Sequence, residues 1–107
     1  MMDRSSVAVL VGADYKSDEI GRQVARETKK AVFCDVGSVS MDEMVEAGRI
    51  GFKPKYKLTL FRYDYNGEPE AELDGQRYRI YRTYLGRGET IELYLEKKAG
   101  VLRGDSV

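Results

Sequence analysis

The sequence has no histidine, a single cysteine and no excess of charge of either sign. Without histidine, the chain lacks the usual proton shuttle of acid–base catalysis, the Ser–His and Cys–His nucleophile pairs and the commonest transition-metal ligand. Cys34 has no second thiol with which to form an internal disulfide, and its apolar neighbours predict a buried, unreactive side chain. These absences argue against an enzyme, and we expect no catalytic residues, no metal and no other cofactor.

The charges balance, with 18 lysines and arginines against 18 aspartates and glutamates. A neutral chain exerts no long-range attraction on nucleic acid or on a membrane, so any charge-driven binding must be local. The apolar run nearest the N-terminus, Val7 to Val11, is shorter than a signal peptide or a membrane span requires. We therefore expect a protein that is made and kept in a reducing cytoplasm and has no membrane partner.

The length of 107 residues predicts one domain over residues 1–107. Val7 to Val11 is β-branched and favours a strand, and Gln23 to Val36 predicts a long strand that enters the core near its end, with a helix as the alternative. Gly12 to Arg22 is polar, bounded by glycines and without periodicity, which predicts a long flexible loop (12–22). The last residues, 102–107, have no pattern and are expected to fray.

A capping motif marks the start of one short helix. Ser40 and Glu43 form the S-x-x-E pattern in which the serine caps the first turn. We predict a helix over about 41–47 that Gly48 ends in a left-handed conformation. A helix of about two turns is marginal alone, so we expect its apolar side chains to hold it against the core: Met41, Met44 and Val45.

Turn dipeptides divide the second half of the chain into strands. Asp74-Gly75 predicts a tight type I′ hairpin, and Asn66-Gly67, which follows an aromatic β-rich segment and precedes Pro69, predicts a wider connection. With a two-residue turn at Asp74-Gly75, Glu72 faces Arg77 and Glu70 faces Arg79. The patterns of this half predict a small antiparallel β domain.

The register of the next hairpin is predicted from its loop length. A loop of two residues (87–88) or four (85–88) keeps the apolar residues on one face, whereas a three-residue loop would mix the faces and is rejected. The predicted core face carries Tyr78, Ile80, Tyr84, Ile91, Leu93 and Leu95. The opposite face carries Arg77, Arg79, Tyr81, Glu92, Tyr94 and Glu96.

Three further segments raise the question of ligand binding. RYRIYRTY, Arg77 to Tyr84, is dense in arginine and tyrosine, and OB-type barrels stack bases on such aromatic residues. Because glutamates face these arginines, we favour a β-meander with one core face and one ion-paired face, and keep an OB-like single-strand-binding module as the alternative. Asp14 to Glu19 lacks the spacing of a calcium loop, and Gly86 to Gly88 opens no helix, so neither predicts an ion or phosphate site.

Four segments in order resemble the head-closure proteins of tailed bacteriophages and prophages, also called head–tail joining or stopper proteins. They are CDVGSVSMDEMVEAGRIGFKP (Cys34 to Pro54), DYNGE (Asp64 to Glu68), DGQRYRIYRTY (Asp74 to Tyr84) and IELYL (Ile91 to Leu95). The similarity covers roughly Val7 to Val101 and implies a small antiparallel β-barrel of about five or six strands with one short α-helix.

The resemblance also implies a structural role in the virion, after assembly in the bacterial host cytoplasm. The implied assembly is a ring of about twelve copies beneath the portal and adaptor of a DNA-filled capsid, which retains the genome and offers a docking surface to the tail. The implied partners are the portal and adaptor proteins, the tail or tail-terminator protein, further copies of the chain and packaged DNA in the channel. A neighbouring role, as adaptor or tail terminator, remains an alternative.

Under this resemblance, long polar loops that order on contact with partners are the candidate contact segments, Gly12 to Arg22 and Gly48 to Lys57. In the second, Phe52 is either an anchor for a partner or a side chain that packs on its own barrel. The candidate interface residues are Tyr15, Asp18, Glu19, Arg49, Phe52, Lys53 and Lys55. The residues expected to be structural are Ser40, Glu43, Gly48, Asp74, Gly75, Tyr78, Ile80, Arg82 and Leu93.

Overall fold

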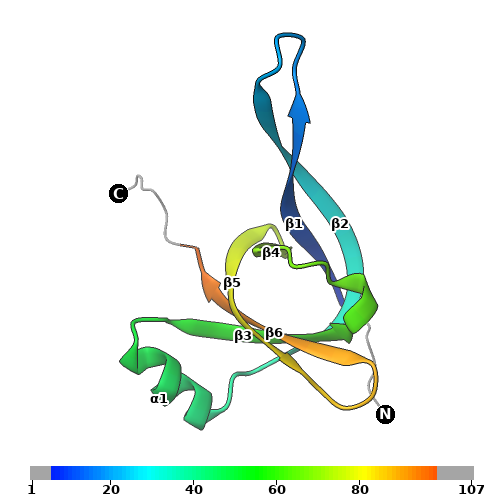
Figure 1. Ribbon diagram of the computed structural model, residues 1–107. Helices are drawn as coiled ribbons and strands as arrows, with labels where there is room; N and C mark the ends of the chain where they lie inside the picture. Colours follow the sequence, from blue (N-terminus) through cyan, green and yellow to red (C-terminus); the bar gives the residue numbers. More distant parts are fainter. Residues whose placement is uncertain (1–5, 99–107) are drawn as a thin grey trace.

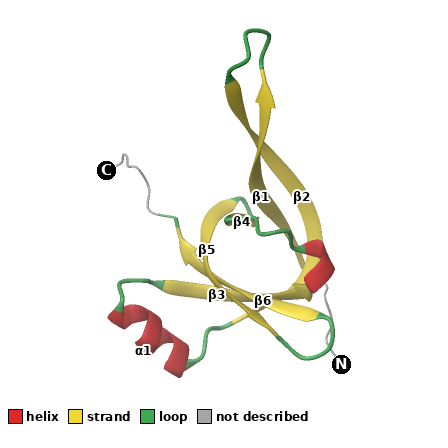
Figure 2. Ribbon diagram, in the orientation of Figure 1, coloured by secondary structure: helices red, strands yellow, loops and turns green. Residues whose placement is uncertain are grey.

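Six β-strands form a closed antiparallel barrel in the computed structural model, which describes residues 6–98 (Figure 1). The strands are β1 (Ser6–Ser17), β2 (Gln23–Gly37), β3 (Pro54–Phe61), β4 (Glu70–Leu73), β5 (Gln76–Leu85) and β6 (Thr90–Lys97). Their order around the barrel is β1-β2-β3-β6-β5-β4. Helix α1 (Met41–Arg49) and the 3₁₀ turn η1 (Arg62–Asp64) complete the elements of this range (Figure 2). The predicted small antiparallel β-barrel with one short α-helix is confirmed.

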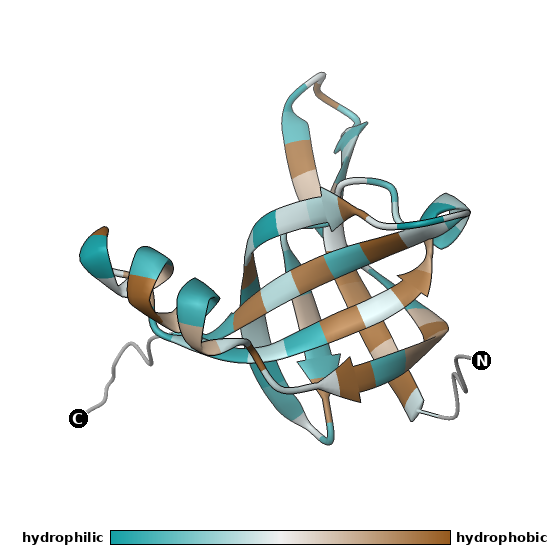
Figure 3. Cartoon of the chain, turned by 90° about the horizontal axis from the view of Figure 1, so that it is seen from below, coloured by the Kyte–Doolittle hydropathy of each residue, from teal (hydrophilic) through white to brown (hydrophobic). Residues whose placement is uncertain are grey.

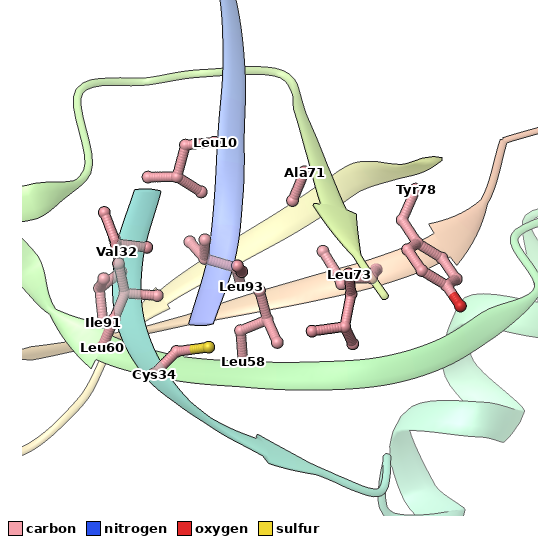
Figure 4. Packing of buried hydrophobic residues seen from close by; sticks show 12 residues of the cluster. Leu10, Val32, Cys34, Leu58, Leu60, Ala71, Leu73, Tyr78, Ile91 and Leu93 are labelled. Atoms are coloured by element: carbon pink, nitrogen blue, oxygen red, sulfur yellow. The ribbon is translucent and has the colours of Figure 1, made fainter. Parts of the chain in front are cut away.

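The barrel interior is filled by side chains that alternate along the strands with outward-facing ones, which gives the strands their striped hydropathy (Figure 3). The central layer is fully buried and made of leucines from neighbouring strands, Leu58 and Leu60 of β3 with Leu93 and Leu95 of β6. The rest of the cluster is Ala8, Leu10, Val32, Cys34, Ala71, Leu73, Tyr78 and Ile91 (Figure 4). Burial raises the pKa of the Cys34 thiol, so the prediction of an unreactive core cysteine agrees with the structure.

The hairpin between β4 and β5 has the predicted turn and register. Asp74 and Gly75 have φ values of 51° and 79°, as a type I′ turn requires of both central residues. Glu72 faces Arg77 and Glu70 faces Arg79. The turn chemistry in the sequence was sufficient here, because a two-residue loop allows a single register.

The hairpin between β5 and β6 contradicts the predicted loop and part of the predicted core face. Strand β5 ends at Leu85 and β6 begins at Thr90, but the amide of Gly86 donates to the carbonyl of Thr90 over 3.0 Å and extends the pairing. The loop is therefore the three-residue one, 87–89, that was rejected. A β-bulge between Ile80 and Arg82 shifts the pairing of β5 with β6 by one residue. The predicted facing therefore holds for Ile80, which pairs with Leu95, but fails for Tyr84, which is exposed opposite Glu92.

Helix α1 begins as predicted and ends later. The Ser40 hydroxyl accepts a hydrogen bond from the amide of Glu43 over 3.2 Å. Gly48 lies within the helix, so the prediction that it forms a left-handed stop is wrong, and the positive φ of 95° belongs to Gly51 instead. The helix ends at Arg49 instead, where the amides of Ile50 and Phe52 donate to the carbonyl of Ala47 over 3.2 and 3.0 Å. Within residues 6–98, no helix has both the length and the apolar character needed to cross a bilayer.

The predicted flexible loop at 12–22 is wrong. Strand β1 continues to Ser17 and pairs with β2 in an unbroken ladder of twelve residue pairs, from Ser6 opposite Cys34 to Ser17 opposite Gln23. The loop proper is confined to 18–22. The sequence concealed this strand because its side chains are exposed on both faces, so no alternation of polar and apolar residues marks it. The predicted frayed tail, 102–107, lies outside the described residues.

Candidate docking surfaces

The distal half of the β1–β2 hairpin, residues 12–28, projects beyond the barrel as a two-stranded ribbon (Figure 1). We call it the arm. Tyr15 and Ile20 are 65% and 75% exposed, and Val24 is also exposed. Tyr15 was a predicted interface residue. Ile20 and Val24 were not among the predicted interface residues; an apolar side chain within a polar segment is the sequence signal that would have drawn attention to them.

The tip of the arm is built around Asp18. Its carboxylate accepts hydrogen bonds from the amides of Ile20 and Arg22 and from the Arg22 guanidinium, at 2.8 to 3.0 Å. The backbone amide of Arg22 is the main cause of the lowered pKa of Asp18. Asp18 therefore shapes the turn, whereas Glu19 beside it is exposed and leaves its carboxylate available to a partner.

Ion pairs fix the root of the arm to the barrel. Lys29 of β2 lies 3.4 Å from Glu72 of β4, and Lys30 lies 3.6 Å from Glu68. A β-carbon at position 12 would lie 3.2 Å from Cγ of Glu68, so glycine allows the chain to pass closely at this point. The direction in which the arm leaves the barrel is therefore set by contacts at its root.

Arg77 is the centre of a charge network on the outer wall. Its guanidinium donates to Glu72 over 2.7 Å and to Glu70 over 2.8 Å, and it also reaches Glu27 of β2 over 3.3 Å. The hydrogen bonds to Glu70 and Glu72 raise the pKa of Arg77. The hydrogen bond from Arg77 lowers the pKa of Glu72, and at Glu70 the bonds from Lys98 and Arg77 outweigh burial and lower the pKa too.

The other two arginines of β5 are also paired. Arg79 forms an ion pair with Glu96 of β6, and Arg82 lies 2.6 Å from Glu43 of α1. The sequence predicted glutamates opposite Arg77 and Arg79, but it did not reveal Glu27 or Glu43 as partners because both come from distant parts of the chain. Strand β5 therefore offers no open row of free arginines to a polyanion.

Glu43 connects α1 to strand β5 of the barrel wall. Besides Arg82, its carboxylate accepts a hydrogen bond from the Tyr81 hydroxyl over 2.8 Å. The hydrogen bond from Arg82 lowers the pKa of Glu43, and burial together with the bond to Glu43 raises the pKa of Tyr81. Nearby, burial and a hydrogen bond to Glu92 raise the pKa of Tyr94 to about 12. The predicted structural residues Glu43 and Arg82 thus act together, as a tether for the helix.

Phe52 packs on its own barrel, as one of the two predicted alternatives for this residue has it. Its ring stacks on Tyr81 at 4.7 Å between centroids, and the Arg79 guanidinium lies over the Phe52 ring, 5.5 Å from its centroid. Lys53 and Lys55 are exposed. Arg49 is exposed as well and lies 3.7 Å from Glu46. The three basic side chains of the predicted contact segment are therefore exposed, but Phe52 among them is already in contact with the barrel.

The apolar side chains of α1 contradict their predicted packing. Met41, Met44 and Val45 are 76%, 44% and 49% exposed, and the buried residue of the helix is Ala47. The helix turns the side that carries Glu43 and Ala47 toward the barrel. The larger apolar side chains on its other side stay exposed. We call the exposed set the α1 face: Met41, Met44, Val45 and Ile50. A groove of about 400 Å³ separates α1 from β5, lined by Glu46, Ala47, Ile50, Phe52, Tyr81 and Arg82 among others.

Within residues 6–98, no three histidine, cysteine, aspartate or glutamate side chains lie together in a way that could hold a metal ion. No protein-family model matches this chain, and no curated protein matches it either. The arm and the α1 face are the candidate docking surfaces, because both project from the barrel and expose apolar side chains. The arginines of β5, by contrast, form ion pairs with glutamates.

Proposed function

We propose that this chain is a structural component of a phage head–tail connector, which closes the DNA-filled capsid below the portal and adaptor and gives the tail a surface on which to dock. In this proposal the chain has no catalytic role and works as one subunit of a ring in the virion, after assembly in the host cytoplasm. The proposal rests on the resemblance of the four sequence segments described above.

One structural observation supports this role most directly. The arm and the α1 face extend away from a barrel whose outer arginines are neutralised by its own glutamates. Exposed apolar side chains on projecting elements are typical of protein–protein contact surfaces. A connector subunit must contact a protein above it, a protein below it and its neighbours in the ring, and two separate projecting surfaces suit that requirement.

Electron microscopy of particles assembled without this protein tests the proposal. We expect capsids that package DNA and then lose it, because the exit would be unsealed. Stable filled heads without tails would instead place the chain further down the assembly, as a tail terminator. Normal tailed particles would contradict a connector role altogether.

Variants of the contact surfaces sharpen this test. Val45→Asp places a charge on the α1 face, where the side chain is half exposed, so the chain should fold normally while head–tail joining fails. Phe52→Ala should also weaken joining, with a modest loss of stability because the ring leaves Tyr81. Normal joining by both folded variants would remove α1 and its flanking segment from the docking surface.

A single-strand-binding module is the second candidate. It is favoured by the aromatic row of Phe52, Tyr81 and Tyr94, beside which Arg79 and Arg82 lie, since stacked bases bind to such platforms. Glu96 and Glu43 neutralise these two arginines, which makes the candidate the weaker one. Fluorescence anisotropy with a labelled oligonucleotide at low salt decides: tight binding that is lost in Tyr81→Ala or Arg79→Ala would favour it over the connector role.

A further inference from the structure

The arm has two backbone edges without a strand partner. Within residues 6–98, β1 pairs with β4 only at Val9–Val11, and β2 pairs with β3 only at Asp35–Gly37. Gly12–Ser17 on one side and Gln23–Thr28 on the other therefore pair with each other and with no third strand in the part of the chain described. An unpaired strand edge presents a row of amides and carbonyls that can template pairing with another chain.

The arm lacks two of the devices with which proteins block such edges. Its ladder has no bulge, and its sequence has no proline; both are common ways to prevent edge pairing. Residues 12–28 hold four acids (14, 18, 19 and 27) and three bases (16, 22 and 26), a net charge of −1. Two arms would therefore repel each other weakly.

A two-stranded ribbon with both faces in water is also marginally stable by itself. The distal arm buries little apolar surface, since the residues from Ala13 to Ser17 and from Gln23 to Lys29 are all exposed. A third and fourth strand would add hydrogen bonds along both edges and cover part of Tyr15 and Val24. Pairing with further strands would therefore stabilise the arm.

We propose that the occupant of these edges is the arm of a second copy of this chain, with the β1 edge of one copy against the β2 edge of the next. In a ring whose arms point the same way, every β1 runs opposite to every β2, so each contact is antiparallel, as it is within the chain. The inference deepens the proposed function, from which it takes the setting of a ring of identical subunits.

The arm sequence suits this contact in the register that it already uses. Within the chain, Asp14 faces Arg26 and Tyr15 faces Ala25, and the Asp14 and Arg26 side chains lie 3.7 Å apart. The same register between copies repeats an acid–base pair and places a large side chain beside a small one. Contacts between two β1 edges would leave the β2 edges unpaired, whereas the head-to-tail contact occupies both edges of every arm.

Self-association of the full chain at millimolar concentration tests the proposal, measured by sedimentation velocity and by hydrogen exchange of the same samples. We expect oligomers in which amides within 12–17 and 23–28 exchange at least about tenfold more slowly than in the dilute monomer, since edge amides gain partners. The amides of α1 should be unchanged. A chain that stays monomeric at this concentration, or oligomers without added protection in both arm segments, would overturn the proposal.

A matched pair of double variants locates the contact. Ala13→Glu/Ala25→Glu adds two acids to exposed positions of the arm, one of them opposite Glu27 in the ladder register, and Met41→Glu/Val45→Glu adds two to the α1 face. The arm variant should stay monomeric with an unchanged unfolding curve, and the α1 variant should associate like the wild type. The opposite result would assign self-association to α1 and reject the arm.

Mixing two single-cysteine variants tests the direction of pairing. Asp14→Cys in one chain and Arg26→Cys in another should form a mixed disulfide in the concentrated sample, while buried Cys34 stays unreactive. Protection of the β1 edge alone, without the mixed disulfide, would indicate β1–β1 pairs and overturn the head-to-tail contact. Failure of arm pairing leaves head closure to the particle experiment, and particles that form normally without the protein would reject the connector role while leaving arm pairing intact.

Discussion

Strands β1 and β2 pass through two different environments, and their two halves show what holds each in place. In the barrel half, Ala8, Leu10 and Val32 point inward and are buried. In the arm, the same two strands keep the same ladder with all side chains from Ala13 to Ser17 exposed. Burial of apolar surface stabilises the first half, whereas backbone pairing and the ion pairs at the root hold the second. The barrel should therefore tolerate changes in the arm far better than the reverse.

The largest difference is expected between two positions on β1. Leu10→Ala removes a fully buried side chain and should lower the free energy of unfolding by about 2–5 kcal/mol. Tyr15→Ala, five residues along the same strand, should change it by less than about 0.5 kcal/mol. Urea denaturation followed by circular dichroism measures both, and equal losses would show that the arm belongs to the cooperative core.

The tether of α1 should matter less than the core and more than the arm. Glu43→Gln weakens the bonds to Arg82 and Tyr81 and should cost about 1 kcal/mol. Glu46→Gln is the matched control, because Glu46 pairs with Arg49 at an exposed site where such pairs contribute little. If the two variants lose the same free energy of unfolding, the tether at Glu43 does not hold the helix.

Two glycines should respond to alanine in opposite directions. Gly75 has a φ of 79°, so Gly75→Ala should destabilise the barrel by about 1 kcal/mol. Gly48 lies inside α1, and a β-carbon there would meet no atom within 4 Å, so Gly48→Ala should stabilise the chain by up to about 1 kcal/mol. Thermal unfolding distinguishes the two. A destabilised Gly48→Ala would contradict the open surroundings of Gly48 on the helix.

The outer ion pairs should make stability fall in acid. Glu43, Glu70 and Glu72 have pKa values below the usual 4.5, so the folded state holds these protons less tightly than the unfolded state does. Their contribution is therefore complete above about pH 4.5 and is lost as the pH falls through the lowered values. Denaturant midpoints between pH 6 and pH 2 test this, with Glu72→Gln expected to flatten the decline. An unchanged slope in that variant would show that the Arg77 network does not stabilise the fold.

The smallest effect is expected when the arm is shortened. Asp14 and Arg26 face each other in the ladder, so an Asn-Gly turn in place of residues 15–25 can close the hairpin near the root. The free energy of unfolding should change by less than about 1 kcal/mol, because the core and the ion pairs at the root of the arm remain. A shortened chain that fails to fold would show that the arm, and not the barrel alone, specifies the structure.

The sequence was most informative where local chemistry had one solution. The Asp74-Gly75 turn, the register of Glu70 and Glu72, the cap at Ser40 and the burial of Cys34 could all be predicted, because each depends on near neighbours in the chain. It failed at the β5–β6 hairpin, where a bulge at Tyr81 offsets the parity of the loop. A loop and a bulge that compensate each other leave no pattern in either segment.

The candidate surfaces divide in the same way. Composition and the resemblance of four segments directed attention to residues 12–22 and 48–57, and both segments lie on or beside projecting surfaces. The tertiary structure decided that the first is a strand pair, that Phe52 is packed and that Met41 and Val45 are exposed. The physical reason is that local rules determine which conformations a segment prefers, whereas the exposure of a face depends on what the rest of the chain brings against it.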